Sequence, residues 1–172
     1  DMLLKTFAEH TNFPLLTVRA TNVYGARQQL FKIIVRACIY IRLGRKIQLH
    51  GGGQAAKSFI HIRDVSKGEL AILERGRVGD IYHLSPDTSI KVREVVRLIA
   101  DCMGTTLRAV SEDTVDRLGQ DAIYEIDSSK ARSEIGWKPE TSLEHGVREV
   151  VQWVNKNWDE IKEMPHEYIH KP

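Results

Sequence analysis

The chain has 172 residues, of which 42% are hydrophobic and 28% charged, and its formal net charge is +2. It is long enough to bury one core, and its composition is that of an ordinary soluble globular protein. The small charge and the dispersed basic residues argue against nucleic acid or an anionic membrane as a partner. The most apolar run, Leu30 to Leu43, is interrupted by Lys32, Arg36 and Arg42, so we expect no membrane span.

The two cysteines, Cys38 and Cys102, both fall on apolar faces of expected helices, and we therefore expect buried free thiols. Free thiols of this kind are typical of a reducing compartment, so the sequence predicts a cytoplasmic protein. No secretory leader is visible, because the chain opens directly on a helix-like segment at 2–9.

Apolar residues recur with the period of a helix in some segments and with that of a strand in others. In chain order they predict a helix at 2–9, a strand at 15–19, a helix at 29–43, strands at 47–50 and 57–62, a helix at 64–75, a strand at 81–84, a helix at 91–103, a strand at 107–110, a polar loop at 111–122, and helices at 128–135 and 142–163. A loop as long as the one at 111–122 is more often functional or mobile than idle.

Two helix starts carry recognisable capping residues. Asp64 is a good N-cap for the helix that follows it. Thr141 and Glu144 match the pattern of a capping box, in which each side chain satisfies a backbone N–H group near the other residue. We therefore expect both helices to begin at these positions.

Helices and apolar strands alternate along the chain, which predicts an α/β fold. We expect 15–19 and 81–84 to join one mainly parallel sheet, with 47–62 and 107–142 forming a smaller lobe over the carboxyl ends of its strands. Asn22 follows the first strand, at the kind of place where open α/β sheets bind ligands, and its amide offers a donor and an acceptor. The alternative is a plain strand-to-helix turn, in which Asn22 and Gly25 tolerate unusual backbone angles.

Five short motifs follow one another in the chain. They are Arg-Ala-Thr-Asn-Val-Tyr-Gly at 19–25, Gln-Leu-His-Gly-Gly-Gly-Gln at 48–54, Lys-Ser-Phe-Ile-His-Ile-Arg-Asp at 57–64, Asp-Arg-Leu-Gly-Gln-Asp at 116–121 and Ile-Gly-Trp-Lys-Pro at 135–139. In this order they resemble the C-terminal half of the extended short-chain dehydrogenase/reductases, and the most similar members are the nucleoside-diphosphate-glucose 4,6-dehydratases. The resemblance covers nearly the whole chain.

The resemblance implies the C-terminal part of a Rossmann-like fold, with the remnant of a mainly parallel sheet and a small α/β substrate-binding lobe. Residues 1–46 would end the NAD-binding domain, and 47–172 would mainly form the substrate-binding lobe, with 64–84 returning to the sheet. The whole enzyme would be a homodimer that uses bound NAD, oxidises a nucleotide sugar at C4, eliminates or epimerises, and returns the hydride. A 4-epimerase or a decarboxylase of the same family remains an alternative, because these enzymes share the C-terminal motifs.

The resemblance also assigns cations to the diphosphate of a nucleotide sugar. Lys57 and Arg117 would bind the diphosphate, and Asn22 and Lys32 would lie near sugar and phosphate. The family typically has Arg at the position of Lys57, so the charge is kept but the bidentate geometry of a guanidinium is not. Phe31 stands where the dehydratases commonly have Glu. The alternatives are a solvated surface arginine for Arg117, an ordinary strand-end lysine for Lys57 and a snorkelling cation on the helix for Lys32.

Other positions would bind the nucleotide base and the cofactor. Gln48 and His50 fall where the family packs the base, and Gln120 stands at a substrate-binding position that is often His in the dehydratases. Ala20 and Thr21 match the backbone beside the nicotinamide of NAD. An exposed strand histidine and a plain strand end are the alternatives for His50 and for 20–21.

Several catalytic signatures are not found in this sequence. It contains no Gly-x-Gly-x-x-Gly motif and no Tyr-x-x-x-Lys pair, and its His, Cys and carboxylate residues lack metal-ligand spacing. The segment that begins at Asp1 resembles the family helix that carries the catalytic Tyr and Lys, so we expect both residues upstream of Asp1 and an inactive isolated chain. A non-catalytic nucleotide-sugar-binding module and a subunit interface are the hypotheses from other classes.

Overall fold

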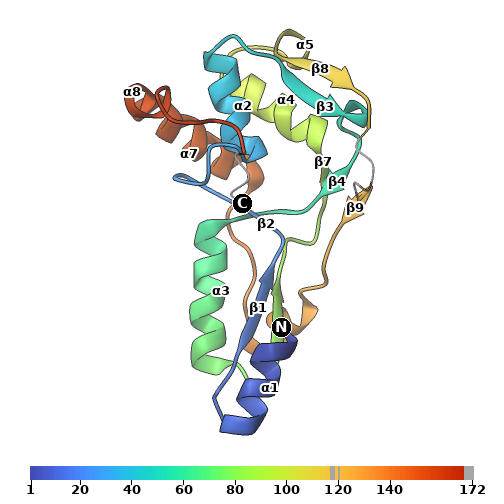
Figure 1. Ribbon diagram of the computed structural model, residues 1–172, viewed down its shortest axis with the longest axis vertical. Helices are drawn as coiled ribbons and strands as arrows, with labels where there is room; N and C mark the ends of the chain where they lie inside the picture. Colours follow the sequence, from blue (N-terminus) through green and yellow to red (C-terminus); the bar gives the residue numbers. More distant parts are fainter. Residues whose placement is uncertain (117–118, 120, 169–172) are drawn as a thin grey trace.

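The structure is a computed structural model that describes residues 1–116, 119 and 121–168 (Figure 1). The helices are α1 (Met2–Thr11), α2 (Ile33–Arg42), α3 (Ile62–Arg75), α4 (Val92–Cys102), α5 (Leu107–Val110), α6 (Ser129–Ile135), α7 (Leu143–Lys156) and α8 (Trp158–Ile161), with a 3-10 turn at Gly51–Gly53. The strands are β1 (Thr17–Ala20), β2 (Asn22–Tyr24), β3 (Ile47–His50), β4 (Ala56–Lys57), β5 (Phe59–His61), β6 (Ile81–Leu84), β7 (Ile90–Lys91), β8 (Ser111–Thr114) and β9 (Ile123–Tyr124).

The strands pair mostly in parallel. β1 and β6 are parallel, with Thr17 opposite Ile81 and Ala20 opposite Leu84, which confirms the expected pairing of these two segments. β2 pairs with β5, and β3 with β8, also in parallel. β4 lies between β7, which is antiparallel to it, and β9, which is parallel.

Two apolar cores divide the molecule into an upper and a lower lobe in Figure 1. In the upper lobe, α2, α4 and α7 pack on one another beside β3, and we call this the three-helix lobe. In the lower lobe, α3 and α6 cover β1 and β6, and we call this the β1–β6 lobe. Ala131, Ile135 and Trp137 belong to the core of the β1–β6 lobe, although the sequence placed them in the smaller lobe. The assignment of 1–46 and 47–172 to two domains stays a prediction.

The β1–β6 lobe depends on a close approach of α3 to β6. A Cβ atom at Gly68 of α3 would lie 2.7 Å from Leu84 Cδ1, so only glycine lets the helix sit this close to the strand. The indole Nε1 of Trp137 donates to the carbonyl oxygen of Asp64 at 2.9 Å and ties the segment after α6 to the same helix. These two contacts fix the position of α3 against β6 and against the segment after α6.

The three-helix lobe follows the predicted apolar periodicity. In α4, Val95, Val96 and Ile99 are fully buried, as their spacing indicated. Cys38 is a buried free thiol, as expected. Cys102 is also a free thiol but is only half-buried, because it is the last residue of α4 and packs at the margin of the core.

The region 107–122 differs from the prediction. Residues Leu107–Val110 form the short helix α5 instead of a strand, because the side chain of Thr106 accepts a hydrogen bond from the N–H group of Ala109. Residues Ser111–Thr114, expected in a loop, form strand β8. This strand is polar, and its pairing with β3 comes from a segment distant in sequence rather than from an apolar pattern.

The start of one predicted helix and the capping residues of two others were also wrong. The helix expected at 29–43 begins at Ile33. The N-cap residue of α3 is His61, whose Nδ1 accepts a hydrogen bond from the N–H of Arg63. Asp64 is buried in the first turn of α3 instead, and its Oδ2 accepts from the N–H of Thr141. Ser142 caps α7 in place of a capping box, by accepting from the N–H of His145.

The strand predicted at 57–62 and the last helix are each divided in two. β4 and β5 belong to different sheets and are separated at Ser58, whose N–H donates to the carbonyl oxygen of Tyr124 at 3.3 Å. The helix expected at 142–163 breaks at Asn157, between α7 and α8. The pattern of apolar residues continues across both breaks, which is why it predicted single elements.

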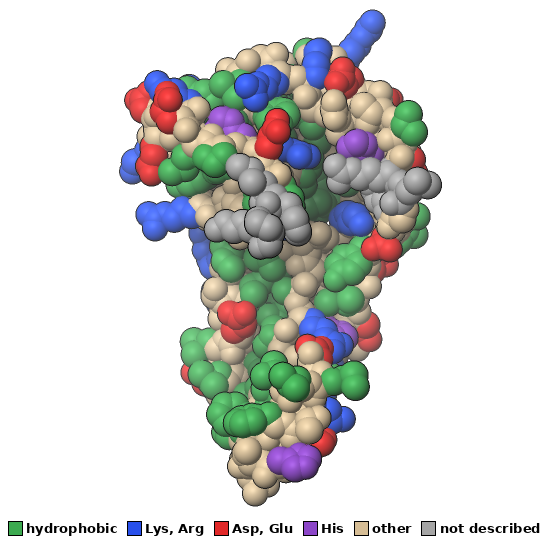
Figure 2. Space-filling model, viewed as in Figure 1, with side chains coloured by type: hydrophobic (Ala, Val, Ile, Leu, Met, Phe, Trp, Pro, Cys, Tyr) green, Lys and Arg blue, Asp and Glu red, His purple; other side chains and the backbone are tan. Residues whose placement is uncertain are grey.

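The amphipathic helix predicted at 2–9 is present as α1, but it buries none of its residues. Its large apolar side chains are exposed, from 55% for Phe7 to 86% for Met2. Figure 2 shows apolar side chains gathered at the lower end of the molecule, where Figure 1 places α1. None of the helices in the described part of the chain is both long and apolar enough to cross a membrane.

Candidate functional site

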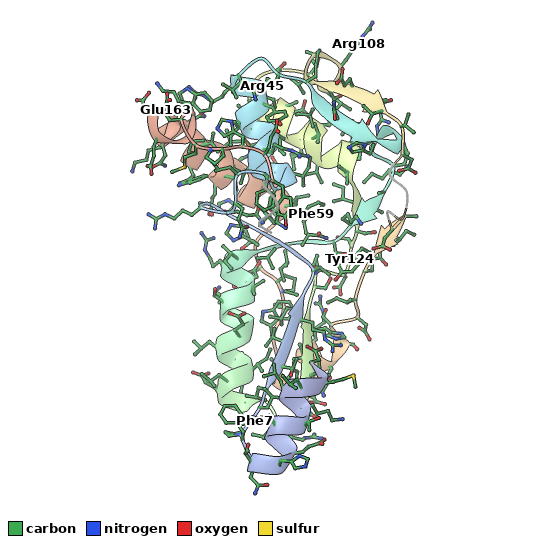
Figure 3. The ribbon with its side chains drawn as sticks, in the orientation of Figure 1. Phe7, Arg45, Phe59, Arg108, Tyr124 and Glu163 are labelled. Atoms are coloured by element: carbon green, nitrogen blue, oxygen red, sulfur yellow. The ribbon has the colours of Figure 1, made fainter. Side chains whose placement is uncertain are left out.

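Two adjoining cavities open where β1 and β2 end. The first, which we call the β1 cavity, has a volume of about 510 Å³ and is lined by Ala20, Thr21, Asn22, Val23, Tyr24, Gln28, Gln29, Lys32, Ile33, Ile34, Phe59 and Tyr124. The second, the β3 cavity, has about 320 Å³ and is lined by Asn22, Ile33, Arg36, Gln48, Leu49, His50, Gly53, Lys57, Phe59 and Val92. They share Asn22, Ile33 and Phe59, and we call the two together the joined cavity. Figure 3 shows Phe59 and Tyr124 at the waist between the two lobes.

Asn22 is held in place by the strand that pairs with β2. Its backbone N–H and its side-chain Nδ2 both donate to the carbonyl oxygen of Ser58, at 3.1 and 2.9 Å. Such a doubly anchored side chain has a fixed orientation, and its Oδ1 is still an acceptor for a ligand. The structure therefore places Asn22 where both cavities meet, as a preorganised polar group.

The N-terminal end of α2 faces the β1 cavity. Lys32 is the N-cap residue, but no side chain caps the helix, and Ile33 and Ile34 of the first turn line the cavity. The first N–H groups of a helix have no acceptor within it, and the helix dipole makes this end positive. Helix ends of this kind are suited to phosphate and other anions.

The charged side chains that line the joined cavity are all basic. They are Lys32, Arg36 and Lys57, and neither cavity has an Asp or Glu in its described lining. The Nζ atom of Lys57 lies 3.4 Å from the carbonyl oxygen of Asp121 and 5.8 Å from the centroid of the Tyr124 ring. Lys32 is exposed, with its Nζ 5.4 Å from the centroid of the Phe31 ring. The electrostatics of the cavity thus favour an anionic ligand.

Gln48 and His50 lie two residues apart on β3 and therefore on one face of the strand, and both line the β3 cavity. His50 Nδ1 lies 3.1 Å from Thr114 Oγ1 and 3.2 Å from the carbonyl oxygen of Val115, which fixes the imidazole against β8. A fixed planar ring beside an amide can stack on a base and bind its edge.

Ala20 and Thr21 form the floor of the β1 cavity at the end of β1. Thr21 is buried, its N–H donates to the carbonyl oxygen of Leu84 at 3.2 Å, and its Oγ1 donates to Ser85 Oγ at 3.4 Å. The N–H and hydroxyl groups of Thr21 are thus bonded within the protein, and Ala20 beside it adds only a methyl side chain to this end of the cavity.

All the sequence-predicted site residues within the described part of the chain line the joined cavity. They are Ala20, Thr21, Asn22, Lys32, Gln48, His50 and Lys57. Arg117 and Gln120 lie outside the described residues. The ligand roles of all these residues stay predictions, whereas their convergence from separate segments is a property of the fold.

Arg36 is a charged residue of the lining that was not predicted as part of the site. In the sequence it was named only because it interrupts the apolar run from Leu30 to Leu43. The available signal was its distance from Lys32, because residues four apart share one face of a helix. Phe59 and Tyr124 were missed as well, since no pattern in the sequence indicates that β5 and β9 meet at one cavity.

Tyr24 also lines the β1 cavity, but its hydroxyl group is turned into the protein. The side chain is 2% exposed, and its hydroxyl donates to the carbonyl oxygen of Leu143 at 3.5 Å. Burial, together with the negative charges of Asp64 and Glu149, raises the pKa of Tyr24 well above its ordinary value. Tyr24 is therefore a structural residue here, and no group of metal-ligating side chains occurs within the described residues to supply a metal centre.

Known proteins resemble this chain in sequence and in fold. The family model for GDP-mannose 4,6 dehydratase matches residues 1–150. A dTDP-D-glucose 4,6-dehydratase of Mus musculus is 29% identical over 170 residues, which are 94% of this chain and 47% of that protein. The chain spans about half the length of the curated relatives that it matches.

Two solved structures of dTDP-glucose 4,6-dehydratases have the same fold. The enzyme of Streptomyces venezuelae, with NAD bound, matches with a TM-score of 0.86 and 25% identity, over 92% of this chain and 49% of that one. The enzyme of Bacillus anthracis, in complex with NAD, matches with a TM-score of 0.84 and 30% identity, over 92% of this chain and 50% of that one. These matches confirm the predicted Rossmann-like α/β fold class.

Proposed function

Since the chain belongs to the GDP-mannose 4,6-dehydratase family, we propose that it is the nucleotide-sugar-binding half of an NAD-dependent nucleoside-diphosphate-sugar 4,6-dehydratase. The dTDP-glucose 4,6-dehydratases at 25–30% identity support this reaction over others of the same fold. The proposal concerns the whole protein, of which this chain matches about half the length of its relatives.

One observation carries the proposal: the joined cavity combines three basic side chains, no described carboxylate and the uncapped N-terminal end of α2. A diphosphate carries its negative charge in the middle of a nucleotide sugar, with the sugar on one side and the nucleoside on the other. In this arrangement the diphosphate lies near Asn22 and Ile33, where the two cavities meet. The sugar occupies the β1 cavity, and the base lies in the β3 cavity between Gln48 and His50.

The lining of the β1 cavity also fits a nicotinamide ring beside the sugar. Ala20 and Thr21 contribute small side chains to this end of the cavity, and the N–H and hydroxyl groups of Thr21 are already hydrogen-bonded within the protein. NAD would supply the hydride acceptor for oxidation of the sugar. The described residues of this chain bind and orient the substrate, and the acid–base residues lie in the part of the relatives that this chain does not match.

We extend the proposal to the compartment and the oligomeric state of the whole protein, which we expect to be a cytoplasmic homodimer.

The products of the complete gene product test this function. The purified protein is incubated with NAD and, one at a time, dTDP-glucose, UDP-glucose and GDP-mannose, and the products are identified by mass spectrometry. The proposal predicts a product that has lost one water molecule. A product of unchanged mass but altered sugar configuration would establish an epimerase instead, and loss of carbon dioxide from an added UDP-glucuronic acid would establish a decarboxylase. Tight binding without any product would leave a binding module.

A further inference from the structure

Arg36 is a cation inside the joined cavity that no described residue neutralises. It lies one helical turn after Lys32 on α2, and its side chain lines the β3 cavity with Lys57 and His50. None of the ion pairs within the described residues includes Arg36. Its only charge-related contact there is with the Tyr40 ring, whose centroid lies 5.9 Å from the Arg36 guanidinium carbon.

Part of this guanidinium is also withdrawn from water. Arg36 Nε is buried and has no hydrogen-bond partner among the described residues. A buried donor without a partner is costly, and a cation costs more than a neutral donor. An anion that enters the cavity beside this guanidinium lowers the cost through its opposite charge, even without a contact to Nε.

Lys57 cannot supply the same kind of contact. Its ammonium group is a point charge on a flexible chain, whereas a guanidinium presents several donors in one plane that match two phosphate oxygens. Lys57 Nζ also lies within hydrogen-bond distance of the carbonyl oxygen of Asp121. Position 57 therefore provides charge, and the guanidinium of the described lining comes from position 36.

We propose that Arg36 is the bidentate diphosphate-binding residue of this site, and that it supplies from α2 the guanidinium that position 57 lacks. The inference rests on the proposed function and goes beyond it by naming a specificity-determining residue. Arg36 makes the site selective for a diphosphate over a nucleoside, because no carboxylate among the described residues pairs with its guanidinium before the diphosphate binds.

The test uses two arginines that share one aromatic ring. Arg45 lies at the same 5.9 Å from the Tyr40 centroid but does not line the joined cavity, so Arg45→Ala is a matched control for Arg36→Ala. In the complete gene product, each variant is titrated calorimetrically with dTDP and with thymidine, and its melting temperature is recorded. We expect Arg36→Ala to weaken dTDP binding by about tenfold to a hundredfold, the range for hydrogen bonds to charged groups. Thymidine binding in Arg36→Ala, and dTDP binding in Arg45→Ala, should be unchanged.

Two further variants test the guanidinium geometry. Arg36→Lys keeps the charge and should bind dTDP with an affinity between those of the wild type and Arg36→Ala. Adding Lys57→Arg to Arg36→Ala should restore part of the lost dTDP affinity, because it returns a guanidinium to the cavity. Full affinity in Arg36→Lys, or no recovery in the double variant, would overturn the bidentate role.

The outcomes separate this inference from the function beneath it. If the wild type and Arg36→Ala bind dTDP equally well, the inference is wrong and the proposed function stands. The same conclusion follows if Arg36→Ala loses as much affinity for thymidine as it loses for dTDP. If the wild type binds no nucleoside diphosphate at all, both are wrong.

Discussion

The hydroxyl of Tyr24 lies directly against the backbone of Gly146, where an added Cβ atom would overlap Tyr24 Oη. Tyr24 ends β2, which begins with Asn22, and Gly146 lies in the first turns of α7. The contact therefore couples the strand at the mouth of the joined cavity to the three-helix lobe. A side chain at position 146 would move this strand or the helix.

Gly146→Ala should destabilise the protein for this reason. Overpacking of a core costs about 1–3 kcal/mol, which outweighs the roughly 0.5–1 kcal/mol that alanine normally contributes over glycine within a helix. The free energy of unfolding is measured in urea, with Gln152→Ala at an exposed position of α7 as control. Addition of Tyr24→Phe should recover part of the loss, since it removes the nearest atom. A stabilised Gly146→Ala variant would contradict the close contact.

Trp137 should contribute to stability through its hydrogen bond as well as its packing. Trp137→Phe removes the indole hydrogen bond to the Asp64 carbonyl oxygen, 2.9 Å away, at a cost of about 0.5–1.5 kcal/mol, the net contribution of one hydrogen bond. Trp153→Phe is the control, because Trp153 is half-buried in the other core and its indole N–H makes no hydrogen bond within the described residues. Equal losses of unfolding free energy in the two variants would show that the hydrogen bond adds nothing.

Acid should destabilise the fold through His61. Burial lowers the pKa of His61 below its ordinary 6.5, even though the charge of Glu149 acts to raise it. The unfolded chain therefore binds this proton first as the pH falls, and the free energy of unfolding decreases below about pH 6.5. The Arg63 side chain lowers the pKa of Glu149 below its ordinary value of 4.5. The free energy of unfolding therefore decreases a second time when the pH falls below about 4.5.

Denaturant unfolding at a series of pH values measures the contribution of His61. The free energy of unfolding should decline more steeply between about pH 6.5 and 5 in the wild type than in His61→Phe. Parallel profiles would exclude His61 as the source.

Lys57 should bind the ligand without contributing to the fold. Lys57→Ala should weaken binding of a nucleoside diphosphate by about 1.5–3 kcal/mol, the range for hydrogen bonds to charged groups. Its melting temperature should barely change, because the side chain is half-buried at the surface and its contacts are few. Lys91→Ala is the matched control, since Lys91 lies opposite Ala56 on the neighbouring strand and does not line the joined cavity. Unchanged affinity in Lys57→Ala would return this residue to an ordinary surface lysine.

The parts of the fold that the sequence predicted correctly are those with strong local patterns. The apolar face of α4 and the parallel pairing of β1 with β6 follow from the spacing of Val95, Val96 and Ile99 and from the alternation of strands and helices. β8 was missed because a polar segment becomes a strand only through its distant partner β3. Asp64 was taken for a helix cap because its bond to Thr141 is made across the tertiary structure.

The site residues differ in the same way, because some were predicted from short local motifs and others depend on contacts between segments that are distant in sequence. Asn22, Lys57 and His50 stand in short motifs, and the resemblance of these motifs to a family predicts that the three residues share one site. Arg36 has no such motif, and its place in the cavity depends on how α2 approaches β3. A basic residue in an apolar helix is therefore visible in the sequence, but its function is not.

The measurement that tests the central claim most directly is amide hydrogen exchange of the complete gene product with and without dTDP-glucose. If the joined cavity binds the nucleotide sugar, the ligand should slow exchange in the segments 20–24, 33–37 and 48–59, which line it. The cavity beside α3, which Arg63, Lys67 and Leu70 line, and the exposed face of α1 should exchange as before. Protection confined to α1 or to the α3 cavity, or no protection at a saturating concentration of ligand, would contradict the assignment of the site.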